Sequence, residues 1–165
     1  MSLHVERFDG PAQQWDAAVR GSEGWTHFHL HGWRTVFTRV FGHECIYLVA
    51  RDSAGEIRGT LPLVRVKSLL FGHYLVSVPF LNYGGPLGDA AAVRALTARA
   101  TELAAAGNVK LLELRNRRPL DIELPVSHRK ITVLLDLVPG SSETLFKRFD
   151  AKLRSQIRRP QKEGV

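Results

Sequence analysis

Seven basic residues gather near the C-terminal end of the chain, between Leu145 and Gly164. Only Asp150 and Glu163 oppose them there, so this stretch carries five of the seven net positive charges of the chain. The basic members are Lys147, Arg148, Lys152, Arg154, Arg158, Arg159 and Lys162. Arginine binds phosphate or carboxylate through two parallel N–H groups, whereas lysine acts as a point charge. The stretch therefore predicts an anion-binding surface, with a merely solvated helix face as the alternative.

The apolar residues of the same stretch repeat at helical spacing. They are Phe146, Phe149, Leu153 and Ile157. Spacings of three and four residues place them on one side of a helix, so we expect a basic helical segment over residues 143–164. Asp150 is suited to cap a second helical segment, and Pro160 to bend or fray the last turn. The exposed cations would suit the phosphates of a small molecule, an anionic membrane surface or RNA.

A second candidate is the glycine-rich loop at residues 81–88, which reads LNYGGPLG. Glycines let backbone N–H groups approach a ligand, and the helix that follows Asp89 has a positive N-terminal end. The alternative is a simple strand-to-helix turn, in which Asp89 caps the helix and would repel phosphate. The candidate binding residues in this loop are Asn82, Tyr83, Gly84, Gly85 and Pro86.

Three histidines, His27, His29 and His31, occupy alternate positions, a spacing that on a strand would place three zinc ligands on one side. The helical spacing that starts at Leu30 interrupts this period, and no cysteine or second cluster accompanies them. We therefore favour capping or surface roles and expect no metal site.

Glu113 lies between two leucines of a predicted strand and is followed two residues later by Arg115. Its carboxylate would suit a general base acting on an amine, but an ion pair with a neighbouring strand is the more common arrangement. The sequence assigns no catalytic residue. It also lacks the GxSxG, GxxxxGK[ST] and HExxH patterns, which disfavours hydrolases and nucleoside triphosphatases.

The elements that must position these residues alternate along the chain. Hydrophobic periodicity and turn residues predict strands at residues 4–8, 44–51, 57–67, 74–80, 109–115 and 131–137, and helices at 11–20, 30–41 and 90–106, before the basic segment. We expect Pro62 to place part of its strand at an edge or a bulge. This order favours an α/β (α+β) fold with a mixed, partly antiparallel sheet flanked by helices.

The composition is that of a globular domain. The chain has 165 residues, of which 44% are hydrophobic and 24% charged, so one domain with one core is expected. No apolar run approaches the roughly 20 residues of a membrane span, and we expect a cytoplasmic protein. Cys45 is the single cysteine and cannot form an internal disulfide, and we expect it as a buried strand thiol. The ending Gly-Val suggests a chain cut before a following strand.

Three motifs in this order resemble the FemAB-like branch of the GNAT acyltransferase superfamily, and in particular FemAB-related proteins associated with the exosortase (PEP-CTERM) system of exopolysaccharide-producing bacteria. They are FHLHGW at residues 28–33, PFLNYGGPL at 79–87, and KLRSQIRR at 152–159 with KEG at 162–164. The likeness spans nearly the whole chain. It implies that residues 1–165 are the first of two tandem GNAT-like domains, incomplete at the C-terminus.

The resemblance also implies an activity. Such enzymes move an aminoacyl group from tRNA, or an acyl group from a CoA thioester, onto an amine of a cell-envelope or exopolysaccharide precursor. The second domain would hold most of the donor, and this half would bind the acceptor and no cofactor. By the same resemblance, Trp33 and the loop residues 82–86 shape the cleft, and Lys152, Arg154, Arg158 and Arg159 hold anionic groups of a substrate. The rival function is a non-catalytic module that binds tRNA or an anionic membrane, at the inner face of the cell membrane, through the basic helix.

Overall fold

The computed structural model describes residues 2–68, 72–127, 131–137 and 139–164. The chain divides into two compact units, Met1–Val126 and Ser127–Val165, which are described separately. No helix among these described residues is long and apolar enough to cross a membrane.

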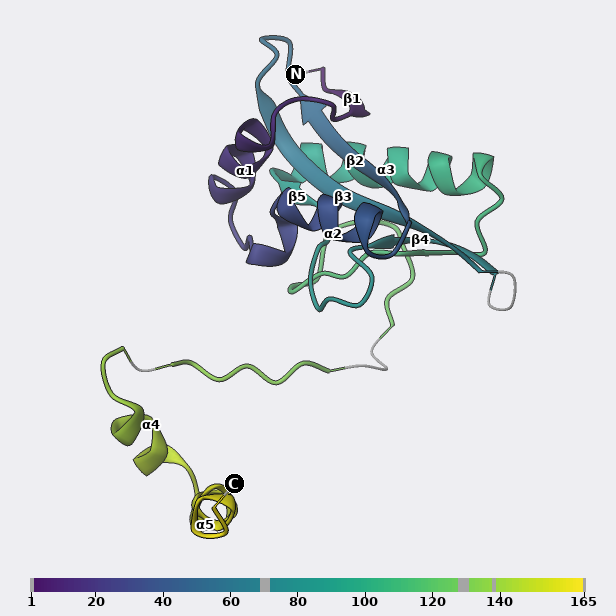
Figure 1. Cartoon of the computed structure of the whole chain (residues 1–165). Coiled ribbons are helices and arrows are strands. Elements are labelled where there is room, and N and C mark those ends of the chain that lie inside the picture. The colour runs from purple at the N-terminus through teal and green to yellow at the C-terminus, as the bar shows by residue number, and fades with distance from the viewer. Residues whose placement is uncertain (1, 69–71, 128–130, 138, 165) are drawn as a thin grey trace. The chain divides into compact units, whose positions relative to one another are not determined.

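The first unit is built on one mixed sheet (Figure 1). Its strands are β1 (His4–Arg7), β2 (Glu44–Arg51), β3 (Ile57–Ser68), β4 (Gly72–Ser77) and β6 (Leu111–Glu113), in that spatial order, and the short β5 (Leu87–Gly88) pairs with β3. All pairs are antiparallel except β4 and β6, which run parallel. The predicted mixed, partly antiparallel sheet is confirmed.

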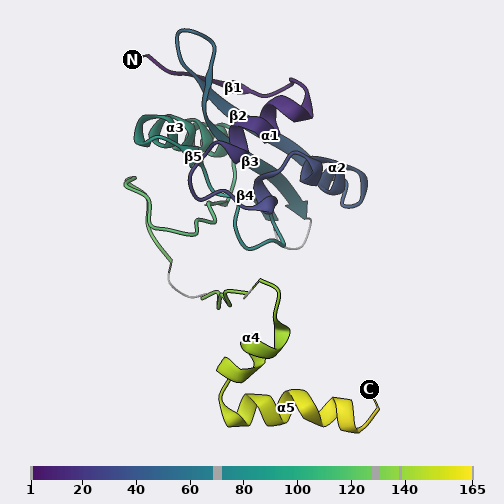
Figure 2. The same cartoon turned by 90° about the vertical axis from the view of Figure 1, so that its left-hand side faces the viewer.

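Helices cover both faces of this sheet. Helix α3 (Ala90–Ala106) lies on one face, and α1 (Ala12–Arg20), the 3-10 turn η1 (His27–His29) and α2 (Gly32–Arg39) lie on the other (Figures 1 and 2). Alternation along β2 supplies both cores: Leu48 packs toward α3, whereas Tyr47 packs on Trp15 of α1. The predicted helices are confirmed, although α2 begins two residues later than expected because residues 27–29 form η1.

The β2–β3 hairpin matches its prediction, with β3 one residue longer. Its turn is held by Asp52, whose Oδ1 accepts hydrogen bonds from the N–H groups of Ala54 and Glu56 (3.0 and 3.1 Å). Cys45 of β2 is only half-buried, so its expected burial is partial. Its thiol donates to the carbonyl of Arg34 (3.8 Å), and burial raises its pKa to about 11.

The expectation for Pro62 is wrong in part. Pro62 lies inside β3 opposite Tyr47, and the irregular register between the two strands falls at Ala50 and Arg51 instead. The carbonyl of Tyr47 bonds to Phe8 on its other side, so Tyr47 and Pro62 exchange no ladder bond. The imino nitrogen of Pro62 therefore points to the opposite edge of β3. On that edge β5 pairs with Gly59 and Thr60 and β4 pairs from Leu63 onward, so no N–H is required at Pro62.

Strand β4 ends at Ser77, three residues before the predicted end. Val78 and Phe80 have φ angles of 44° and 68°, which take the backbone out of the β region. Strand β6 is likewise shorter than the predicted 109–115.

The second unit contains α4 (Ser142–Arg148) and α5 (Ala151–Lys162). The basic segment is thus two helices, and Asp150 caps the second by accepting a hydrogen bond from Leu153 N–H (2.7 Å), as predicted. Helix α5 continues past Pro160 to Lys162, so its last turn is not frayed. The prediction of a strand at 131–137 is wrong: these residues form no ladder, and their side chains are exposed. Alternating apolar residues need a neighbouring strand to become one.

Candidate functional site

The parallel pair β4–β6 separates at its carboxyl end. Backbone pairing joins Tyr74–Val76 to Leu111–Glu113 and then stops. Beyond it a side chain bridges the strands, because Ser77 Oγ accepts a hydrogen bond from Arg115 N–H (2.8 Å). Ligands of sheets that contain parallel strands commonly bind outside the carboxyl ends of those strands.

A groove of about 310 Å³ lies on the face of the sheet over these paired strands and reaches Pro79 and Phe80 beyond the end of β4. It is lined by Val66, Tyr74, Val76, Pro79, Phe80, Leu111 and Glu113. Strand register explains the set, because Tyr74 pairs with both Val66 and Leu111, and Val76 pairs with Glu113, so these side chains share one face. Glu113 is the one acidic residue in an otherwise largely apolar lining.

An aromatic cluster forms one rim of the groove. The ring of Phe80 lies 5.0 Å from that of Phe41 and 6.2 Å from that of His43, measured between centroids. Phe80 is 64% exposed and Phe41 is 47% exposed. Exposed large apolar groups that adjoin a groove are typical of binding sites.

Arg115 holds the surroundings of the groove together. Its Nε donates to Glu113 Oε1 (2.9 Å), and its Nη1 donates to the carbonyl of Leu81 (2.7 Å). Its own carbonyl accepts hydrogen bonds from Gly84 N–H and Gly85 N–H (3.0 and 2.9 Å). One residue therefore fixes the groove carboxylate, the end of β6 and the glycine-rich loop. The expected ion pair of Glu113 exists, but its partner Arg115 lies two residues further along the chain, just after β6, and not on a neighbouring strand.

The glycines of the loop are required for close packing. A Cβ at Gly84 would overlap Val78 Cγ2, and one at Gly85 would overlap Asn116 Oδ1. The N–H groups of both glycines bond to Arg115, so they face the backbone of the protein and not an external anion.

The N-terminus of α3 is occupied as well. Asp89 Oδ1 accepts from Ala92 N–H (2.9 Å), and Asp89 Oδ2 lies 3.3 Å from Arg58 Nη2. The bond from Ala92, followed by the Arg58 guanidinium, lowers the pKa of Asp89 below its usual value. A negative charge that caps the helix disfavours phosphate at this end, as the turn interpretation of the loop requires.

The structure brings Trp33 and Tyr83 together around Phe28, whose ring lies 6.2 Å from Trp33 and 6.5 Å from Tyr83. Trp33 also donates from Nε1 to the carbonyl of His27 (3.0 Å). Asn82 is exposed, whereas Pro86 is buried. The aromatic part of the predicted cleft is therefore one cluster.

His29 connects that cluster to the loop. Thr26 N–H donates to its Nδ1 (3.1 Å), and its ring also hydrogen-bonds to the backbone of Gly85. Burial lowers the pKa of His29 below its ordinary value. The Thr26 carbonyl, 3.3 Å from Nδ1, and the Gly85 backbone favour the protonated ring and partly oppose this. Burial also lowers the pKa of His31. Residues 27–29 form η1 and not a strand, and no group of three potential ligands that could hold a metal occurs among the described residues.

The four predicted basic residues lie on α5, in the second unit. Arg154 Nη1 donates to the carbonyls of Lys147 and Phe149 (3.2 and 3.1 Å), and Arg159 pairs with Glu163 (3.0 Å). The Arg158 guanidinium lies 5.0 Å from the centre of the Phe146 ring. Lys152 is exposed. An open hollow of about 490 Å³ lies between side chains of α5, including Arg154, Arg158 and Arg159.

In the first unit, Trp33 and Tyr83 of the loop thus lie around one phenylalanine, Phe28. In the second unit, the four basic residues lie on one helix, α5. That both groups contact one substrate, as the resemblance implies, stays a prediction. The sequence did not indicate the apolar lining of the β4–β6 groove, because it depends on strand register. The alternation of Tyr74 and Val76 along one predicted strand, together with Glu113 on another, was the sequence pattern that could have indicated a shared face.

No protein-family model matches the chain, and no curated protein matches it. Among solved structures, the chain is similar to the crystal structure of a GNAT family acetyltransferase from Staphylococcus aureus subsp. aureus USA300_TCH1516. The identity is 13% and the TM-score 0.50, over 82% of this chain and all of that one. The chain has a GNAT-like fold.

Proposed function

We propose that this chain is part of an N-acyltransferase, and that the groove between β4 and β6 receives the amine acceptor. The observation that supports this is the position of Glu113, a carboxylate in a largely apolar groove, at the last paired position of the two parallel strands of a GNAT-like sheet. Side chains at such a point can contact a substrate without disturbing the ladder.

The proposed reaction needs few groups. The amine nitrogen attacks the carbonyl carbon of a thioester or ester, the C–N bond of the amide forms, and the C–S or C–O bond to the thiol or alcohol breaks. Glu113 takes the proton that the amine loses, the departing thiolate or alkoxide takes a proton from water, and Glu113 then releases its proton to water. Arg115 holds the carboxylate in place. Positioning of the two substrates supplies much of the remaining acceleration.

At a finer level, the proposal follows the FemAB-like motifs. The donor is an acyl-CoA or an aminoacyl-tRNA, bound mainly by a second GNAT-like domain of the same protein. The acceptor is an amine of a cell-envelope or exopolysaccharide precursor. Trp33 and Tyr83 flank Phe28 on the face that carries the groove, which suits a contribution to acceptor binding.

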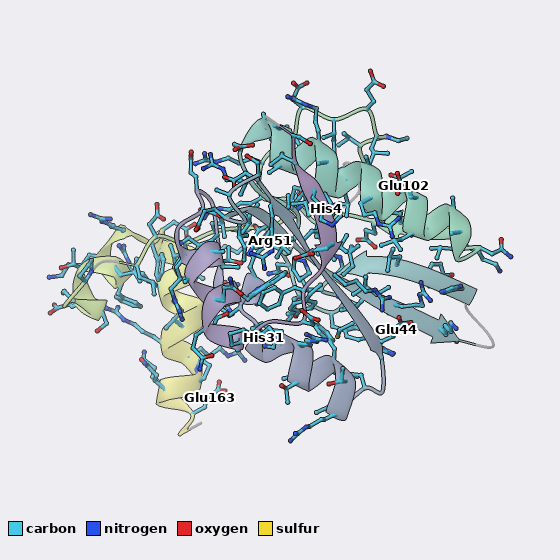
Figure 3. All side chains as sticks on the ribbon, turned by 90° about the horizontal axis from the view of Figure 1, so that it is seen from above. His4, His31, Glu44, Arg51, Glu102 and Glu163 are labelled. Carbon is cyan, nitrogen blue, oxygen red and sulfur yellow. The ribbon has the colours of Figure 1, made fainter. Side chains whose placement is uncertain are left out.

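The test is acyl transfer by the complete protein, followed as thiol released from acyl-CoA or as deacylated tRNA in the presence of amines. Glu113→Gln should lower kcat about 10²–10⁴-fold and change KM less, which is the range for a lost general base. The matched control is Glu102→Gln, since Glu102 pairs with Arg99 on α3 (2.8 Å; Figure 3). Equal activity of Glu113→Gln and the parent rejects Glu113 as the base, and the absence of transfer from either donor rejects the acyltransferase.

A second candidate is a binding module for tRNA or an anionic membrane. The supporting observation is that neither α4 nor α5 has a buried residue, while α5 exposes Lys152, Arg158 and Arg159. Arg158→Ala combined with Arg159→Ala should weaken tRNA binding and make it less salt-dependent. Lys110→Ala, an exposed cation outside α5, is the control. Binding to tRNA or anionic vesicles that the double variant leaves unchanged rejects this role for α5.

A further inference from the structure

We propose that the acceptor bound in the β4–β6 groove is a primary amine joined to a hydrocarbon segment. This inference rests on the proposed function and adds the chemical class of the acceptor.

The walls suit a hydrocarbon. Val66, Val76, Pro79 and Leu111 present aliphatic surface, and Phe80 presents an aromatic ring. Apart from Glu113, Tyr74 is the one polar side chain in the lining, so a polar acceptor would leave most of its hydroxyl or amide groups against these walls without partners, which is costly. A hydrocarbon segment that covers the same surface gains binding free energy in proportion to the apolar area that is removed from water.

The single carboxylate suits an amine. Glu113 is the one acidic group in the lining, and its side chain is 38% exposed. A carboxylate offers about four acceptor positions, so the bond that Oε1 receives from Arg115 leaves capacity for an ammonium group. A negatively charged head group would be repelled by the same oxygens. Charge complementarity therefore selects an amine over a carboxylate.

The rim extends the apolar surface beyond the groove. Phe80 and Phe41 are exposed and in ring contact, and His43 stacks against both rings. The groove of about 310 Å³ is at the lower end of the roughly 300–1,000 Å³ of small-molecule pockets. A segment longer than the groove would continue along these rings. The acceptor class is thus a cationic amphiphile, with its amine at Glu113 and its chain toward Phe80.

The test measures binding without any acyl donor, by calorimetry on the 165-residue chain. The probes are straight-chain primary amines from butylamine to decylamine, with alkanols and alkanoates of matching length. We expect the affinity of the amines to rise about fourfold per added methylene until the groove is filled. Amines should bind more tightly than alkanols, and alkanoates most weakly.

Three variants separate the parts of the site. Glu113→Gln should remove the preference for amines over alkanols and keep the dependence on chain length. Leu111→Ser should weaken that dependence, and Phe80→Ser should do the same from the rim. Leu111 is 48% exposed, so its replacement is tolerable, and Leu134→Ser is the control because Leu134 is 57% exposed and does not line the groove.

Three outcomes would each overturn the inference. They are affinities that do not depend on chain length, alkanoates that bind as tightly as amines, and equal effects of Leu111→Ser and Leu134→Ser. The outcomes for the two proposals differ. Alkylamine binding without acyl transfer by the complete protein rejects the proposed reaction and keeps the amine site. Acyl transfer to hydrophilic amines, without alkylamine binding, keeps the reaction and rejects the acceptor class.

Discussion

At the scale of single residues, Arg115 is the residue that connects the parts of the candidate site. Its side chain is 22% exposed and bonds to both Glu113 and the carbonyl of Leu81. Its backbone meets Ser77 and the two loop glycines. The position of the carboxylate and the path of the loop therefore depend on the same residue.

Arg115→Gln should lower the free energy of unfolding by about 1–3 kcal/mol, because a half-buried carboxylate and a carbonyl lose a charged donor. The measurement is urea unfolding followed by circular dichroism. The matched control is Arg118→Gln, whose pair with Glu23 is largely exposed (74% and 87%) and should contribute at most about 0.5 kcal/mol. Equal losses in the two variants would contradict the role of Arg115.

A second residue-scale prediction concerns pH. The pKa of His29 is lowered in the folded chain, so on acidification the unfolded chain takes up the proton first. Stability should therefore fall as the pH drops below the ordinary histidine value of 6.5, and the fall should level off below the folded pKa. His29→Asn should make this part of the profile of melting temperature against pH less steep, while His31, whose pKa burial also lowers, keeps a slope of the same sign. His4→Asn, at an exposed position, should leave the profile unchanged.

At the scale of elements, the loop between β4 and α3 depends on the close approach of the Gly84 backbone to the side chain of Val78. Val78 is fully buried, packs with Phe37 and Val64, and has a positive φ that valine rarely adopts. Gly84 lies directly against it. The unusual backbone after β4 therefore depends on the absence of a side chain at Gly84.

Gly84→Ala should destabilise the chain by about 1–3 kcal/mol, because the added methyl group must displace a buried valine. Gly32→Ala is the control, since a Cβ there meets open space at the start of α2 and alanine favours a helix. Thermal unfolding of both variants checks this. A Gly84→Ala chain as stable as the parent would show that the loop can move away from Val78.

Much of the element map follows from the sequence, for reasons visible in particular residues. Alternation and the turn at Asp52 placed the β2–β3 hairpin, and Asp89 and Asp150 marked helix starts that the structure confirms. The early end of β4 was missed because nothing in the identity of Val78 signals a left-handed backbone. The strand predicted at 131–137 was wrong because a β pattern does not itself provide a partner strand.

For the site, the sequence indicated the glycine-rich loop, the aromatic residues and Glu113 as a carboxylate of interest. It did not indicate that the two glycine N–H groups bond to Arg115, nor that Glu113 lines a groove. Both facts depend on the register of β4 against β6, which involves residues more than thirty positions apart.

At the scale of the whole molecule, the two units differ in how they bury apolar surface. The first has three clusters of buried residues between its sheet and helices. In the second, no described residue is buried, and Ile131 and Val133 are 89% and 86% exposed. Stability of the described chain therefore resides in the first unit.

Limited proteolysis should reflect this difference. Cleavage should concentrate within residues 117–148 and leave an N-terminal fragment that unfolds cooperatively, at nearly the melting temperature of the whole chain. Mass spectrometry and calorimetry of the fragment check the expectation. First cleavages within β2 or α3, or a fragment that no longer unfolds cooperatively, would contradict it.

The single thiol of Cys45 has a use that follows from its surroundings. The thiolate is the form that attacks alkylating reagents. Burial raises the pKa of this thiol to about 11, and the thiol donates a hydrogen bond to the carbonyl of Arg34 in α2. Iodoacetamide would therefore react slowly until α2 lifts from β2. Because the chain has no other cysteine, the rate of labelling measures how often α2 separates from β2.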